Sequence, residues 1–143
     1  MFFRRRKRKD GGAALVEFAF IMPFLILLLL GIIEFGWIMA QNNDVRHGAR
    51  EGARLAAVNT PSNSPDLVTA TCDSMDLTSA VTVQFSRDGG NIGDTGTVTV
   101  IATPGSLSGA SLIEIFLPDT LTTSVEFRLE QPPGWSDFGP EPC

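Results

Sequence analysis

Few residues of this 143-residue chain have the types and spacing of a catalytic site. His47 is the single histidine, and no serine or cysteine forms a nucleophile–base arrangement with it. The acidic residues are scattered, and the clusters of metal ligands and the glycine-rich loops of phosphate sites are absent. Asp88, Asn91 and Asp94 do not have the spacing of a calcium loop, so RDGGNIGDTG predicts a turn. We therefore predict a protein that is not an enzyme, with no cofactor, metal or small-molecule substrate.

The chain has two cysteines, Cys72 and Cys143. Outside the cytoplasm a disulfide between them is the first expectation, and it would tie the C-terminal tail to a predicted helix. Two free thiols are the alternative, and the sequence does not decide between them.

Glu17 indicates another kind of chemistry, because this carboxylate stands at the edge of a long apolar run. No side chain from Phe18 to Ile33 is charged or strongly polar. A helix needs about 20 such residues to cross a hydrocarbon core of about 30 Å, so we predict a transmembrane helix over residues 13–40. Glu17 either extends to the lipid headgroups or has a functional role there. Glu34, at the other end of the run, either pairs with a partner or faces water.

The residues before the apolar run form an ordered pattern. Residues 1–12 are a leader with six basic side chains, followed by Gly12, four further residues, Glu17 and Phe18. This order resembles the processing signal of type IV prepilins, in the form used by tight-adherence (Tad, Flp) pili. The resemblance implies that a prepilin peptidase cuts between Gly12 and Ala13, and that Glu17 sets the register between pilin-like subunits. Phe18 departs from the tyrosine that the major Flp pilins usually carry.

The resemblance extends through roughly the first 58 residues and is closest to the TadE-like family, small pilin-like components of Tad assembly systems. The matching residues are Ala14, Leu15, Val16, Glu17, Phe18, Ala19, Pro23, Gly31, Glu34, Phe35, Gly36, Ala49, Arg50, Glu51, Gly52, Ala53 and Arg54. It implies a minor pilin or pseudopilin that is matured by a prepilin peptidase. Its implied partners are the membrane, pilin-like subunits and the Tad assembly machinery.

The charge distribution predicts the topology. Six of the eleven basic residues lie in the leader, and five basic against fifteen acidic residues follow Gly12. By the positive-inside rule the leader stays in the cytoplasm, so the later part of the chain is predicted outside the inner membrane. An acidic domain of this kind argues against a nucleic-acid partner.

Residues 41–58 are predicted to extend the membrane helix beyond the bilayer. Arg46, Arg50 and Arg54 recur every fourth residue and form one stripe, which most often faces solvent or headgroups. Gly48 and Gly52 belong to a stripe of small residues. That stripe indicates close packing against the chain's own sheet or against a neighbouring subunit.

Residues 59–130 are predicted to form a small α+β head, followed by a Pro/Gly-rich tail over 131–143. A second helix is expected over 65–76, and period-two alternation predicts strands near 81–86, 97–100 and 121–130. Residues 106–116 are expected to be a short helix or an apolar loop. The predicted fold class is α+β and pilin-like, with a long N-terminal helix and a roughly three-stranded antiparallel sheet.

Two alternatives follow from the same segment. The chain could be an unprocessed single-pass module that anchors an extracellular binding domain. It could also be a secreted domain released by signal cleavage near Gln41, although the apolar run is longer than a typical signal and 38–40 is a poor cleavage site.

Overall fold

The computed structural model describes residues 11–78, 80–107 and 118–143. The predicted leader, apart from Gly11 and Gly12, and most of the segment predicted over 106–116 lie outside these residues. The helices and strands are α1 Gly11–Ala57, α2 Ser64–Cys72, β1 Val81–Arg87, β2 Thr95–Ala102, β3 Leu121–Arg128 and β4 Phe138–Pro142.

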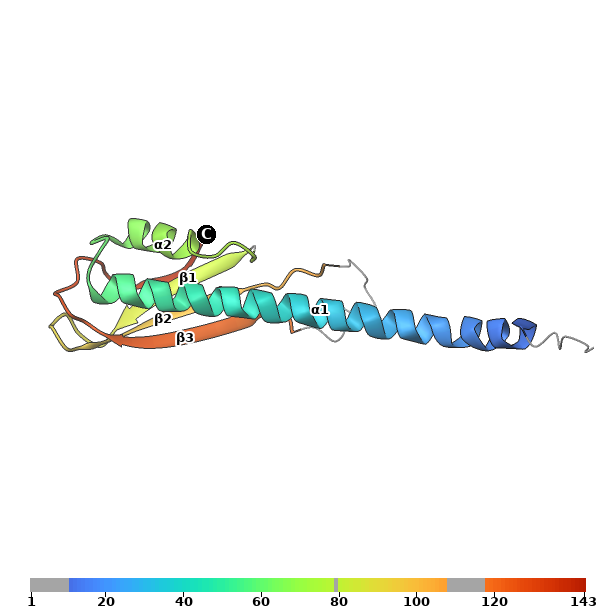
Figure 1. Cartoon of the computed structure of the whole chain (residues 1–143). Coiled ribbons are helices and arrows are strands. Elements are labelled where there is room, and N and C mark those ends of the chain that lie inside the picture. The colour runs from blue at the N-terminus through green and yellow to red at the C-terminus, as the bar shows by residue number, and fades with distance from the viewer. Residues whose placement is uncertain (1–10, 79, 108–117) are drawn as a thin grey trace, which may run out of the picture.

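Helix α1 is one continuous helix of 47 residues. It includes both the range predicted to cross the membrane and the range predicted to extend it. Pro23 lies inside the helix and does not interrupt it, although its missing N–H removes one backbone hydrogen bond. Figure 1 shows that the first half of α1 projects away from the rest of the protein, whereas its second half lies along the sheet.

The sheet is antiparallel, with the strand order β3-β2-β1-β4. Val83 pairs with Val100, and Val98 pairs with Val125, so alternate apolar side chains of the three predicted strands lie on one face. Helices α1 and α2 cover that face, α1 against β2 and β3 and α2 against β1. The α+β class with a long N-terminal helix and a second short helix is confirmed.

The fourth strand is a difference from the three that the sequence predicts. Its residues come from the Pro/Gly-rich tail, and prolines are tolerated at a sheet edge because no ladder hydrogen bond is needed on the outer side. Trp135 anchors the approach to β4: it is 1% exposed, and its Nε1 donates to Ala56 O at 3.2 Å. The Phe85 ring lies between the rings of Trp135 and Phe138, with centroids 5.8 and 5.1 Å away.

A disulfide joins Cys72 at the end of α2 to Cys143, with the Cα atoms 5.7 Å apart. The Cys143 N–H also donates to Val81 O at 2.9 Å. Both contacts hold the end of the chain beside β1 and α2.

Helix α2 is shorter than predicted and begins differently. It starts at Ser64, and the side chain of Asn63 accepts the Asp66 N–H at 2.9 Å and caps the helix. After Cys72 the chain turns, and Met75 packs on α1.

The small-residue stripe of α1 packs against the chain's own head. A methyl group at Gly52 would lie 2.8 Å from Thr71 Oγ1, and a methyl group at Gly48 would overlap Met75 Sδ. Glycine at these two positions therefore lets α2 and the turn after it approach α1 closely.

Candidate functional site

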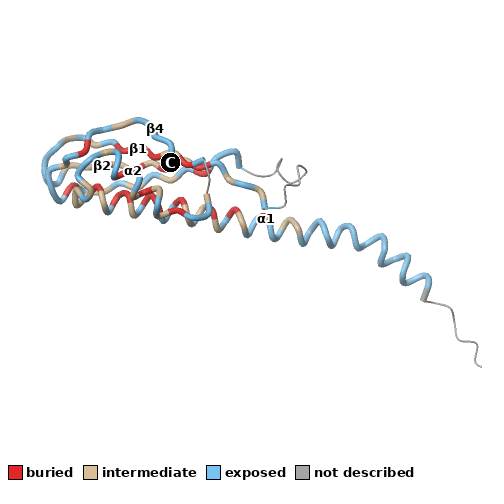
Figure 2. Tube along the Cα trace, turned by 90° about the horizontal axis from the view of Figure 1, so that it is seen from above, coloured by how far each residue is buried: buried red, intermediate tan, exposed pale blue. Residues whose placement is uncertain are grey.

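The first half of α1 has no covering element among the described residues. Its large apolar side chains are exposed, including Leu15 at 70% and both Phe20 and Phe24 at 74% (Figure 2). The most apolar window of α1 has a mean hydropathy of 2.7. Exposing such an apolar surface to water costs a free energy of about 25 cal/mol per Å². The described residues thus contain one helix long and apolar enough to cross a membrane, in agreement with the prediction.

The predicted processing residues lie in the first two turns of this exposed rod. Gly12 and Ala13 are helical, and Glu17 follows Gly12 by about 7.5 Å along the axis at 1.5 Å per residue. Glu17 and Phe18 are both exposed, and within the described part of the chain Glu17 makes no hydrogen bond or ion pair. A carboxylate in this position needs a partner from another molecule, from the solvent or from the headgroups.

Of the two sequence expectations for Glu34, the structure contradicts exposure to water. Glu34 is 1% exposed and accepts the Leu107 N–H at 2.9 Å. The physical reason is that the segment after β2 folds down over this turn of α1, where a carboxylate can accept an otherwise unpaired backbone donor.

Two more side chains of α1 bind the same segment. The Gln41 amide makes a reciprocal pair with Gly105: its Nε2 donates to Gly105 O, and its Oε1 accepts from Gly105 N, both at 2.8 Å. Trp37 Nε1 donates to the same carbonyl at 2.9 Å. We call Glu34, Trp37 and Gln41, with the backbone of residues 105–107, the polar clamp.

The sequence analysis missed the polar clamp, although one signal pointed to it. Glu34, Ile38, Gln41 and Val45 are spaced by three or four residues and are all buried, on the face that continues to Gly48. Two polar residues on an otherwise apolar stripe indicate that the stripe meets backbone groups there. The clamp holds the head to α1 where the bare part of the helix ends.

The arginine stripe lies exposed on α1. Arg54 donates through Nε to Glu51 Oε2 at 2.9 Å and through its terminal nitrogen to Oε1. The hydrogen bond from Arg54 lowers the pKa of the Glu51 carboxyl, and the same bond raises the pKa of Arg54. Arg46 and Arg50 have no ion-pair partner in the described part of the protein. Within the described residues the stripe is therefore a basic surface on which two of the three arginines form no ion pair.

The loop between β1 and β2 is a turn, as the sequence predicts. Asp94 accepts the Asn91 N–H at 2.8 Å, and the Asp88 N–H donates to Thr95 O. Among the described residues no group of three or more His, Cys, Asp or Glu side chains could hold a metal ion.

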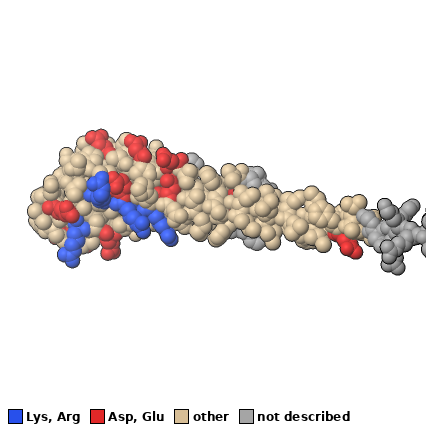
Figure 3. Space-filling view, viewed as in Figure 1, with Lys and Arg blue, Asp and Glu red and all other residues tan. Residues whose placement is uncertain are grey.

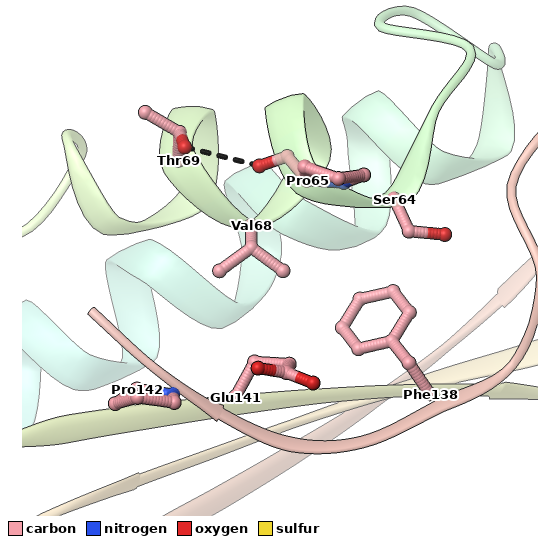
Figure 4. A pocket seen from close by; sticks show the side chains of 7 residues that line it. All are labelled: Ser64, Pro65, Val68, Thr69, Phe138, Glu141 and Pro142. Atoms are coloured by element: carbon pink, nitrogen blue, oxygen red, sulfur yellow. Dashed lines mark hydrogen bonds between the residues drawn. The ribbon is translucent and has the colours of Figure 1, made fainter.

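A half-open pocket of about 360 Å³ lies on the head between α2 and β4. Figure 4 shows Val68 and Phe138 facing each other across it, with Glu141 at its side. The pocket is lined by Ser64, Pro65, Val68, Thr69, Phe138, Glu141 and Pro142.

Comparison with known proteins agrees with the geometry of α1. The model of the family described as TadE-like protein matches residues 12–54, from the predicted processing glycine to the last arginine of the stripe. Neither the curated proteins nor the solved structures compared with the chain include a match. The predicted resemblance to the TadE-like family is thus confirmed over residues 12–54, which comprise the bare membrane-type helix, the polar clamp's three α1 side chains and the arginine stripe.

Proposed function

We propose that this chain is a TadE-like pseudopilin or minor pilin, a structural component in the assembly of a Tad pilus. The observation that carries the proposal is the family match over residues 12–54, on a helix whose first half is apolar and bare. A Tad pilus-associated membrane component is the function that this match supports. We further propose that a prepilin peptidase processes the chain, that pilin-like subunits are its partners and that it catalyses no reaction.

In this proposal α1 lies first in the membrane and later in the core of a fibre. It holds the subunit in the inner membrane, with the basic leader in the cytoplasm and the head outside, as the positive-inside rule requires. After cleavage between Gly12 and Ala13, the same apolar surface packs in a fibre core. Glu17 then pairs with the new N-terminal amine of a neighbouring subunit, since an unpaired carboxylate would be costly in that apolar core.

The experiment is intact mass with N-terminal sequencing of the protein from cells with and without the prepilin peptidase. A peptidase-dependent start at Ala13 is expected. Gly12→Val should block the cleavage, and Gly11→Ala is the matched control that should leave it intact. A start at Met1 in both strains would contradict the processing proposal.

A second candidate function is a membrane-anchored binding module that is never processed. The pocket between α2 and β4 favours it, because an apolar floor with a carboxylate at its side can hold a partner's side chain. The same experiment separates the two, since the binding module keeps its leader.

A further inference from the structure

We propose that copies of this chain associate side by side in the membrane, the basic row of one copy against the acidic row of the next. The basic row is the arginine stripe described above, Arg46, Arg50 and Arg54. The acidic row consists of Asp66, Asp73 and Asp76. The inference rests on the membrane anchoring in the proposed function and names a second copy as the partner of the head.

The basic row is available for a partner. Its members are four residues apart, so it runs for about 12 Å along one flank of α1. Arg46 and Arg50 carry charges that no described acidic group compensates. Arg54 is bound to Glu51, but its side chain is 62% exposed, and exposed ion pairs exchange at little cost.

The acidic row lies at the same height along α1, because α2 runs antiparallel beside it. Met75 lies against Gly48, and Thr71 lies against Gly52. Asp73 comes between these two contacts and is exposed, level with the middle arginine of the basic row.

The heights of the two ends of the acidic row along α1 also follow from contacts and from the course of α2. The N–H groups of Asp76 and Leu77 donate to the Asp44 carboxylate at 3.3 and 2.9 Å, so this end of the row lies just below Arg46. Asp66 is in the first turn of α2, at the other end. Both terminal members of the row are exposed.

The rows cannot neutralise each other within one chain. Helix α2 sits on the side of α1 that presents Asp44, Gly48 and Gly52, and the arginines project from another side. No ion pair joins the two rows among the described residues. Figure 3 shows basic side chains on the head part of α1 and acidic side chains along the edge where α2 lies.

Membrane anchoring makes the rows complementary between copies. Parallel copies in one bilayer hold their heads at one height, so a basic row meets a neighbour's acidic row without an axial shift. Lipid headgroups are too far away for most of the basic row. Arg50 and Arg54 follow Trp37 by about 20 and 26 Å along the helix, whereas the headgroup layer is about 5–8 Å thick.

The test uses the full-length protein in phosphatidylcholine vesicles, with donor and acceptor fluorophores on a C-terminal peptide tag. Energy transfer at several protein-to-lipid ratios gives the association constant. Arg50→Glu and Asp73→Lys are each expected to weaken association about tenfold, since one attraction becomes a repulsion. Arg128→Glu, an exposed reversal on β3 outside the basic row, is the matched control and should associate like the original protein.

The decisive sample mixes donor-labelled Arg50→Glu with acceptor-labelled Asp73→Lys. Two attractive contacts are then available between unlike copies: the native Arg50 of one variant with the native Asp73 of the other, and the carboxylate introduced at position 50 with the ammonium group introduced at position 73. Association in the mixture should therefore return toward that of the original protein, although each variant alone associates more weakly. Unchanged association of the single variants would overturn the proposal. So would a mixture that associates no better than its components, or association that requires anionic lipid.

Flotation of the same samples with the vesicles tests membrane anchoring separately from the side-by-side contact. A chain that floats but shows no charge-dependent energy transfer overturns the side-by-side contact alone. A chain that does not float contradicts the anchoring in the proposed function, and the contact is overturned with it.

Discussion

At the scale of single residues, two carboxylates of α1 have opposite environments. Glu17 is exposed without a partner in the described chain, whereas Glu34 is buried and accepts a backbone N–H. Their sequence settings are alike, since both border the same apolar run. The difference arises because the head covers α1 only from Glu34 onward.

Glu17→Leu is expected to leave membrane insertion intact and to abolish incorporation into the pilus assembly. Leucine fits the bilayer better than a carboxylate does, but it cannot pair with a neighbour's amine. Flotation measures insertion, and shearing of cells followed by immunoblotting measures incorporation. Glu126→Leu, on the exposed side of β3, is the control. Normal incorporation of the Glu17→Leu protein would exclude a register role for this carboxylate.

Glu34→Leu is expected to lower the free energy of unfolding by about 1–3 kcal/mol, because the Leu107 N–H loses its buried acceptor. Glu34→Gln keeps a side-chain oxygen at the same reach and should cost less. Denaturant unfolding of the full-length protein in micelles measures both. If the Gln variant were as unstable as the Leu variant, the hydrogen bond to Leu107 would not be the cause.

At the scale of elements, the close packing of α2 against α1 depends on glycine. Gly52 faces Thr71, whose hydroxyl donates to Leu67 O at 2.8 Å and is therefore fixed. An added methyl group at this position has no room, whereas one at Gly36 meets no atom within 4 Å.

Gly52→Ala is therefore expected to be less stable than Gly36→Ala by about 1–3 kcal/mol. Both substitutions bring the same gain in helix propensity, so their difference isolates the steric conflict. Thermal unfolding of the two variants in the same detergent makes the comparison. Equal stability would show that α2 can move away from α1 without cost.

The sequence predicts the elements better than the contacts between them. Apolar length predicted α1, and period-two alternation predicted β1, β2 and β3. It did not predict β4, because Pro140 and Pro142 are typical of irregular tails and form a strand here only at a sheet edge. The polar clamp was missed for another reason: its acceptors and donors on the head side are backbone groups, 64 to 73 residues from their partners on α1.

At the scale of the whole molecule, α1 has two halves with different surroundings. The bare half is covered by no described element, whereas one face of the other half is buried under the sheet and α2 (Figure 2). The polar clamp lies where the bare half ends, and it includes Trp37, a residue type that is enriched at membrane–water interfaces.

Trp37 fluorescence is expected to be quenched more strongly by a nitroxide near the headgroups than by one in the middle of the lipid chain. Trp135, which contacts α1 at Ala56, lies about 28 Å farther along the rod and should be quenched little. Trp37→Phe should thus remove most of the depth-dependent quenching in vesicles. Quenching that survives this substitution would place the membrane boundary elsewhere.

The continuity of α1 has a mechanical consequence. No described residue between Gly11 and Ala57 breaks the helix, and over 47 residues it is about 70 Å long. The polar clamp ties α1 to the head at the point where the bare half ends. An axial push or a rotation of the bare half of the helix can therefore reach the head through one continuous hydrogen-bonded element, without crossing a loop.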